Sequence, residues 1–291
     1  MSIKRSPLFF TETDGEVVCN LCPHNCNIKS GFFGVCGVRG NKSGIGIIPF
    51  YGFITALAMD PIEKKPLYHF KPGTKILSLG FAGCNLRCPF CQNWHISQNS
   101  DIFENQNGRS RYMSPAEIIS AALTHDSPSI AYTYSEPLVH TEFLLDCMVL
   151  ARKNGIANVL VTNGCINADA AAKILALTDA ANIDLKTFSA ETYKKTLGGD
   201  LHTVLEFIRL CYQMGVHIEI TTLVVPGLND FDIELNSIAE FIAGLDIAIP
   251  WHLTAYHPDF RWNAPPTDRN FLLNTAKEAR KILQNVHTGN I

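Results

Sequence analysis

Short apolar runs alternate with amphipathic segments along most of the chain after residue 75. The runs are nearly continuous in apolar character, which is typical of strands buried on both faces. The segments between them have helical periodicity, and several of them end in glycine. We expect strands at 75–81, 129–134, 158–164, 181–188, 216–225 and 250–257. We expect helices from Ser114 onward and at 137–155, 167–178, 201–215, 231–245 and 268–283.

This order gives about six β-α units, which predict an α/β fold with a parallel sheet and helices outside it. The sheet is either barrel-like or doubly wound. No G-x-G-x-x-G follows a strand, so a dinucleotide-binding fold has no support. In a barrel-like sheet the active site lies at the C-terminal ends of the strands. Residues 45–70 are mixed, with an expected strand or hairpin and then a proline-rich loop.

The first 44 residues differ from the rest, because they are rich in Cys, Gly, Asn and Lys and have little apolar periodicity. Such a segment needs a bound metal to stay folded. It contains Cys19, Cys22, Cys26 and Cys36, and four thiolates form a closed zinc site or a fully ligated second [4Fe-4S] cluster. His24 is a possible substitute for one of the four. We therefore expect a metal-binding module over 1–44 and a core over 45–291.

Composition and charge limit the possible partners and the cellular compartment. The formal net charge is −3 and no Lys/Arg run occurs, so nothing indicates nucleic-acid binding. We find no signal peptide and no apolar stretch of membrane-spanning length, so we expect a cytoplasmic protein. In a reducing compartment, clustered cysteines indicate metal or cluster sites rather than disulfides. The scattered Cys147, Cys165 and Cys211 are expected to be small buried residues.

The second cysteine group lies in GCNLRCPFCQN, directly after the expected strand at 75–81. Cys84, Cys88 and Cys91 have the spacing C-x3-C-x2-C, and three thiolates can hold three corners of a [4Fe-4S] cluster. No fourth Cys is nearby, which leaves one iron open for a ligand. The alternative is a structural zinc loop completed by His95.

This motif, with Phe90 as the aromatic residue before the third Cys, resembles the signature of the radical S-adenosylmethionine (SAM) superfamily. The resemblance implies a partial (β/α)6 barrel in which Cys84, Cys88 and Cys91 hold the cluster. It also implies that SAM binds the open iron and is cleaved reductively, and that the resulting 5′-deoxyadenosyl radical takes hydrogen from a substrate. An electron donor such as flavodoxin or ferredoxin is implied as a partner.

Residues at the ends of the next strands are then expected to bind SAM. Glu136, with Tyr134 beside it, occupies the place of the family's glycine/glutamate motif and is expected to bind the SAM ammonium. Asn163 is expected to contact the ribose or methionine. Asp184 and Lys186 resemble the D-x-K of glycyl radical enzyme activases, in which the lysine would pair with the SAM carboxylate. The alternatives are a helix N-terminal carboxylate, a plain turn and a surface lysine.

The last strands add further candidates. Phe90 and Val225, the latter in VPGLND, are expected to pack near the adenine, although VPGLND is equally typical of an N-cap turn. Alternate residues of a strand share a face, so His252, Thr254 and Tyr256 are expected to face the barrel interior. We consider them for substrate contact or a radical relay, with a hydrogen-bonded core histidine as the alternative.

The segments CNLCPHNCNI, GFFGVCGVR, DPIEKKPLYHFKPG and GCNLRCPFCQNWHISQ together resemble the AmmeMemoRadiSam subfamily, which is related to pyruvate formate-lyase activating enzyme. This resemblance implies Memo-like and AMMECR1-like proteins as partners. Two other functions are considered: a glycyl radical enzyme activase acting on a partner protein, and a non-catalytic zinc or iron-sulfur scaffold. Of the functions considered, only the scaffold would not bind SAM.

Overall fold

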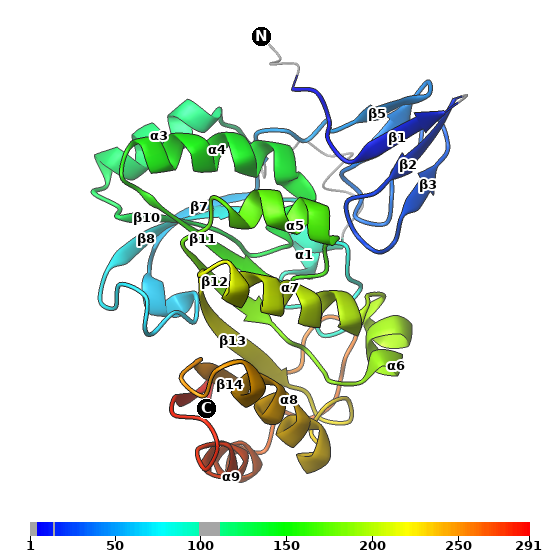
Figure 1. The fold of residues 1–291 in the computed structure, drawn as a ribbon. Coiled ribbons are helices and arrows are strands. Elements are labelled where there is room, and N and C mark those ends of the chain that lie inside the picture. Colours follow the sequence, from blue (N-terminus) through cyan, green and yellow to red (C-terminus); the bar gives the residue numbers. More distant parts are fainter. Residues whose placement is uncertain (1–4, 14, 99–110) are drawn as a thin grey trace.

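The computed structural model describes residues 5–13, 15–98 and 111–291. Within them, the central sheet has eight strands in the order β15-β14-β13-β12-β11-β10-β8-β7 (Figure 1). Six are the predicted parallel strands: β8 (Lys75–Gly80), β10 (Ser129–Thr133), β11 (Ala157–Thr162), β12 (Ala180–Asp184), β13 (His217–Val224) and β14 (Trp251–Ala255). The predicted α/β class with a mostly parallel sheet is confirmed.

Two edge strands complete the sheet. β15 (Val286–Gly289) is parallel to β14, and β7 (Ala56–Pro61) is antiparallel to β8. The pattern predicted no strand at 286–289, and it indicated only a strand or hairpin between residues 45 and 70. The two edges do not pair with each other, so the sheet is open.

Helices follow the strands and lie along one side of the sheet (Figure 1). The longer ones are α3 (Pro115–Thr124), α4 (Thr141–Lys153), α5 (Ala168–Leu175), α7 (Leu201–Gln213), α8 (Asp232–Leu245) and α9 (Arg269–Ala279). The short ones are η1 (Ile62–Lys64), α1 (Trp94–Ser97), η2 (Pro137–His140), α6 (Ala190–Thr192) and the π-helical η3 (Tyr193–Leu197). Helix α3 begins at the predicted capping box, in which Ser114 and Glu117 bond each other's backbone N–H groups.

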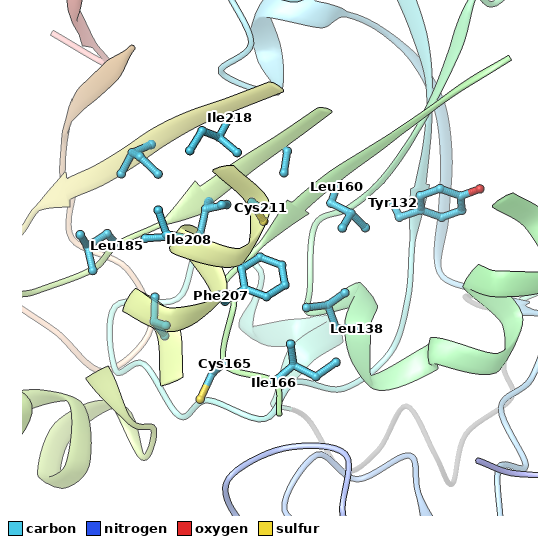
Figure 2. Close-up of a cluster of buried hydrophobic side chains, with 14 of the residues drawn as sticks. Tyr132, Leu138, Leu160, Cys165, Ile166, Leu185, Phe207, Ile208, Cys211 and Ile218 are labelled. Atoms are coloured by element: carbon cyan, nitrogen blue, oxygen red, sulfur yellow. The ribbon is translucent and has the colours of Figure 1, made fainter. Parts of the chain in front are cut away.

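The main core lies between the helices and the sheet. Helix α7 has apolar residues at helical spacing, and Figure 2 shows its Phe207, Ile208 and Cys211 among the buried side chains that include Leu160 and Ile218 of the sheet. The three scattered cysteines, Cys147, Cys165 and Cys211, are completely buried, as predicted. Among the described helices, none combines the length and apolar character needed to cross a bilayer.

The N-terminal residues form small separate sheets. Strands β1 (Phe10–Thr13), β2 (Glu16–Cys19) and β3 (Cys26–Ile28) make an antiparallel sheet. A hairpin of β4 (Gly40–Lys42) and β5 (Ile45–Ile47) follows, and the predicted division after residue 44 falls at its turn. The pair β6 (Phe53–Ile54) and β9 (Arg111–Tyr112) joins the described residues on either side of 99–110.

A buried ion pair fastens this module to the core. The guanidinium of Arg39 donates to both carboxylate oxygens of Glu142 on α4, at 2.8 and 3.0 Å. Both side chains are 1% exposed, so neither charge has water as a substitute partner. Arg39 also donates from Nε to the Sγ of Cys19 at 3.4 Å.

Candidate active site

The three cysteines of the C-x3-C-x2-C motif face one cavity of about 560 Å³ at the C-terminal ends of the strands. Cys84, Cys88 and Cys91 lie in the loop between β8 and α1, and no fourth cysteine is among the described residues that line the cavity. Burial raises the pKa of Cys88 to about 11, although the nearby Lys186 ammonium acts in the opposite direction. A bound metal would be needed to keep the Cys88 thiol deprotonated.

The loop is held by contacts on both sides. Gly83 has a φ of +83°, and a Cβ there would lie 2.4 Å from the carbonyl oxygen of Cys36. The side chain of Asn85 donates to the carbonyl of Cys165 at 2.6 Å, and the carbonyl of Asn85 bonds Nε2 of His24 at 2.8 Å. His24, which the sequence suggested as a possible substitute for one N-terminal cysteine, thus contacts the cysteine loop through Nε2. The N-terminal module is built directly against this loop.

His95 does not complete a zinc site. It is exposed and is not among the residues that line the cavity. The described cavity lining offers three thiols and no fourth, and this set fits a [4Fe-4S] cluster better than a tetrahedral zinc ion, because each cysteine of a cubane binds its own iron.

Glu136 lies at the end of β10, is 1% exposed and lines the cavity. Its Oε1 accepts hydrogen bonds from the hydroxyl of Thr162 at 2.7 Å and the N–H of Leu138 at 3.0 Å. Its Oε2 accepts one from the N–H of Asn163 at 2.8 Å. Burial raises the pKa of Glu136 to about 7, and these three donors limit the rise. These bonds hold the carboxyl group in one orientation, and its Oε2 accepts a hydrogen bond from only one of the described residues.

Asn163, Asp184 and Lys186 line the same cavity from the next two strand ends. The amide of Asn163 donates to Oδ1 of Asn85 at 3.0 Å and approaches the Sγ of Cys84 at 3.7 Å. Lys186 pairs with Asp184 at 3.0 Å. Burial alone would lower the pKa of Lys186, but Asp184 and Cys88 raise it to well above its ordinary value. A permanent cation therefore stands beside the cysteine loop.

The structure also places Phe90, Tyr134, His252 and Thr254 in the cavity wall. Tyr134 has a φ of +70°, where most residues other than glycine are strained. Its hydroxyl donates to Oδ2 of Asp60 at 2.7 Å.

Two predicted site residues do not reach the cavity. Val225 and Tyr256 are completely buried and are not among its lining residues. Each lies one residue beyond the end of its strand, so the alternation from which Tyr256 was expected to face inward no longer applies to it. The N–H of Val225 donates to the side chain of Asn229 at 2.6 Å, and the hydroxyl of Tyr256 donates to the carbonyl of Trp262. Neither side chain is thus placed at the cavity wall as expected, and contact of Val225 with an adenine and of Tyr256 with a substrate stay predictions.

The sequence reasoning missed Asp60, Lys65 and Glu219. Asp60 pairs with the buried Lys65 at 2.7 Å, and the Lys65 ammonium lies 4.2 Å from the centre of the Tyr134 ring. Glu219 is completely buried beneath the cavity. A carboxylate within an apolar strand, as in MDP and HIEIT, is the signal that could have identified both acids.

The N-terminal cysteines are close enough to influence one another. Cys19 and Cys26 are opposite each other in β2 and β3. Burial raises the pKa of Cys22 to about 12, with smaller contributions from Cys36 and Cys19. In the part of the chain that the structure describes, no group of three or more His, Cys, Asp or Glu residues forms a ready-made metal-ion site. A metal in this module is therefore not shown.

Comparison with known proteins identifies the class of this enzyme. The family model of the radical SAM superfamily matches residues 79–236, which is more than half of the chain. The chain therefore belongs to the radical SAM superfamily and is a radical SAM enzyme.

The chain is also similar to curated proteins, and its fold is similar to a solved structure. The chain is 40% identical over 296 residues to an uncharacterized protein of Methanocaldococcus jannaschii, covering 99% of this chain and 85% of that one. It is 25% identical over 193 residues to the pyruvate formate-lyase-activating enzyme of Streptococcus mutans, covering 62% and 71%. Its fold resembles QueE from Escherichia coli, with a TM-score of 0.52 at 15% identity over 81% and 92% of the two chains.

Proposed function

We propose that this enzyme holds a [4Fe-4S] cluster through Cys84, Cys88 and Cys91 and cleaves SAM reductively. The observation that carries the proposal is the cavity wall, in which these three cysteines face charged and polar side chains from the next strand ends. When bound, the cluster and SAM would supply an electron and a carbon radical that removes hydrogen from a substrate.

The proposed roles of the protein groups follow from their charges. Lys186 stays cationic and would pair with the SAM carboxylate. Glu136 has a carboxyl group held in one orientation, and its Oε2 accepts a single hydrogen bond, from the N–H of Asn163. Its pKa is raised to about 7, and the SAM ammonium would keep it ionised by donating to this oxygen. Asn163 lies between Glu136 and the cysteine loop, where its side chain would contact the ribose or methionine.

An anaerobic assay tests this proposal. The protein is reconstituted with iron and sulfide, mixed with SAM and a strong reductant, and assayed for 5′-deoxyadenosine and methionine. We expect both products in equal amounts from the wild type. Cys88→Ala should form neither and should leave any N-terminal metal in place. Product formation by Cys88→Ala would exclude the assignment of the cluster to these cysteines.

A narrower proposal concerns the reaction partner. The Streptococcus mutans relative and an Escherichia coli relative are pyruvate formate-lyase-activating enzymes, which favours an activase as the second candidate. An activase would leave a stable radical on a partner protein, detectable by electron paramagnetic resonance.

The AmmeMemoRadiSam assignment, with Memo-like and AMMECR1-like partners and a flavodoxin or ferredoxin donor, remains a proposal supported by the quoted sequence segments. A cytoplasmic location is likewise proposed; all ten cysteines are free thiols. The scaffold alternative is not retained, because the chain is an enzyme.

The N-terminal module is proposed to bind zinc or a second iron-sulfur cluster. The four cysteines close together in sequence support this, as does Arg39, which donates a hydrogen bond from Nε to the Sγ of Cys19. Metal analysis of the Cys88→Ala variant tests it, since zinc or iron should remain at about one site per chain. Loss of all metal from that variant would contradict it.

A further inference from the structure

Tyr134 has a backbone conformation that a tyrosine rarely adopts. It follows the last residue of β10, and its φ is +70°, in the left-handed region. There a Cβ crowds the carbonyl oxygen that follows it, a strain that glycine does not have. Tyr134 lines the cavity and lies two residues before Glu136. Such strain persists only where the surrounding contacts hold the residue in place.

Two buried charged residues hold the Tyr134 side chain. Its hydroxyl donates to Oδ2 of Asp60 on β7 at 2.7 Å, and Nζ of Lys65 donates to the same oxygen at 2.7 Å. The Lys65 ammonium lies over the Tyr134 ring, 4.2 Å from its centre. Asp60 is 5% exposed and Lys65 is 2% exposed, so water competes little for either group. We call Asp60 and Lys65 the Tyr134 clamp.

The turn that begins at Tyr134 carries Glu136 toward the next strand. The N–H of Ser135 donates to the carbonyl of Thr133 at 3.0 Å, and the Ser135 hydroxyl donates to the carbonyl of Phe81 at 2.8 Å. The carboxyl group of Glu136 is then bonded to the end of β11. A different φ at Tyr134 would rotate the chain that follows it. The conformation of Tyr134 therefore sets the direction in which Glu136 leaves β10.

The clamp lies outside the cavity. Neither Asp60 nor Lys65 is among the described residues that line it, whereas Tyr134 and Glu136 are. A buried ion pair often adds no net stability relative to well-packed apolar residues, because both charges lose their hydration. What this pair does fix is geometry, since the phenol hydroxyl has an ionic acceptor and the ring has a cation over its face. These contacts offset the left-handed strain of Tyr134.

We propose that the clamp holds Tyr134 in the left-handed conformation, and that this conformation aims the carboxyl group of Glu136 into the cavity. Asp60 and Lys65 are thus positioning residues for SAM. This inference deepens the proposed function and rests on it in one respect, because it takes Glu136 as the group that binds the SAM ammonium. It gives a role to charged residues of DPIEKKP, which lie outside the cysteine motif.

Hydrogen exchange at two amides tests the proposal on the full chain as purified, without SAM. The N–H groups of Leu138 and Asn163 donate to the Glu136 carboxyl group at 3.0 and 2.8 Å, so their exchange reports whether that group is in place. Tyr134→Ala removes the clamped ring and keeps a Cβ, whereas Tyr134→Gly removes the ring and relieves the strain. We expect both amides to exchange about ten-fold faster in Tyr134→Ala than in Tyr134→Gly, which corresponds to the left-handed penalty of a residue with a Cβ.

Matched variants separate positioning from a general loss of stability. Asp60→Asn/Lys65→Met removes the clamp without leaving an unpaired buried charge. It should speed exchange of the two amides in the wild-type background and have no further effect on them in the Tyr134→Gly background, where the clamp has no ring to hold. Asp126 is the control position, because it also has a positive φ, of +49°, but is exposed in the turn before β10. Alanine and glycine there should leave the two amides alike.

Either of two results would overturn the proposal. One is equal exchange of the two amides in Tyr134→Ala and Tyr134→Gly, and the other is an equal effect of Asp60→Asn/Lys65→Met in both backgrounds. In the protein loaded with its cluster, SAM should bind about ten-fold more weakly to Tyr134→Ala than to Tyr134→Gly, and equal affinities would remove the link to SAM. Failure of the proposed function would appear separately, as no SAM binding by the wild type, while the exchange rates would still decide whether the clamp positions Glu136.

Discussion

The ion pair between Arg39 and Glu142 gives a quantitative prediction about how the N-terminal module is attached. In Arg39→Met the carboxylate of Glu142 loses two hydrogen bonds and keeps one, from the N–H of Leu8 at 2.6 Å. Because both side chains are 1% exposed, the remaining charge stays buried and uncompensated. Removing one partner of such a pair costs about 3–5 kcal/mol.

Hydrogen exchange measures this cost directly. Each 1.4 kcal/mol corresponds to a factor of ten, so amides of β2 to β5 should exchange about a hundred to a few thousand times faster in Arg39→Met. The double variant Arg39→Met/Glu142→Gln removes both charges and should recover most of the protection. Arg209→Met is the control, because its pair with Glu206 is exposed on both sides and contributes less than about 1 kcal/mol. An increase below about ten-fold, or a double variant as unprotected as the single one, would refute this reasoning.

Three further changes test the site and its support. Lys186→Met should weaken SAM binding about ten- to hundred-fold in equilibrium dialysis, because a charge-assisted hydrogen bond contributes about 1.5–3 kcal/mol. Lys195→Met, at an exposed position, should leave SAM binding unchanged. Equal losses of SAM affinity in the two variants would contradict the role of Lys186. Gly83→Ala should abolish iron incorporation, because the added Cβ would collide with the backbone of Cys36. Gly73→Ala is the control, since Gly73 also has a positive φ but has open space around it, and this variant should retain iron. Iron in both variants would show that the close approach of Gly83 to Cys36 is unimportant. Glu219→Gln should lower the free energy of unfolding by about 3 kcal/mol at pH 7, since the carboxyl pKa falls from 4.5 to about 2 on folding. This contribution is fully present above about pH 4.5 and is lost as the pH falls toward 2, so urea titrations at pH 7 and pH 4 should show the wild-type advantage narrowing, and a constant gap would refute it.

The regular part of the fold could be predicted because each β-α unit carries its own local signals. Apolar runs marked the six parallel strands, and a capping box marked the start of α3. The edge strand β15 was missed because VHTG has no apolar run and pairs on one side only. Strand β7 was indicated only as part of a mixed segment, because its antiparallel pairing with β8 depends on the tertiary fold.

The site could be predicted in part for a similar reason. Parallel strands end at the same edge of the sheet, so Glu136, Asn163 and Lys186 come together with the cysteine loop although they are far apart in sequence. Val225 and Tyr256 were assigned to the same edge, but the chain turns away immediately after both strands end. The placement of Tyr256 therefore could not be predicted from strand alternation alone, nor that of Val225 from its position in VPGLND.

The hydrogen bonds of the buried Glu219 could not be predicted from the strand ends. They come from the N–H groups of Tyr68 and His69, which lie about 150 residues earlier in the sequence. The buried carboxylate in HIEIT was visible in the sequence, but its partners were not. Contacts of this kind are set by how the β7–β8 connection crosses the sheet.

The most direct test of the account is whether SAM binds an open iron of the cluster held by Cys84, Cys88 and Cys91. The reduced protein is examined by electron paramagnetic resonance with and without SAM, in a Cys22→Ala/Cys26→Ala background that removes any N-terminal cluster. We predict a cluster signal whose g values change when SAM is added, and no such signal once Cys88→Ala is introduced. A signal that is unchanged by saturating SAM, or that survives Cys88→Ala, would contradict the account.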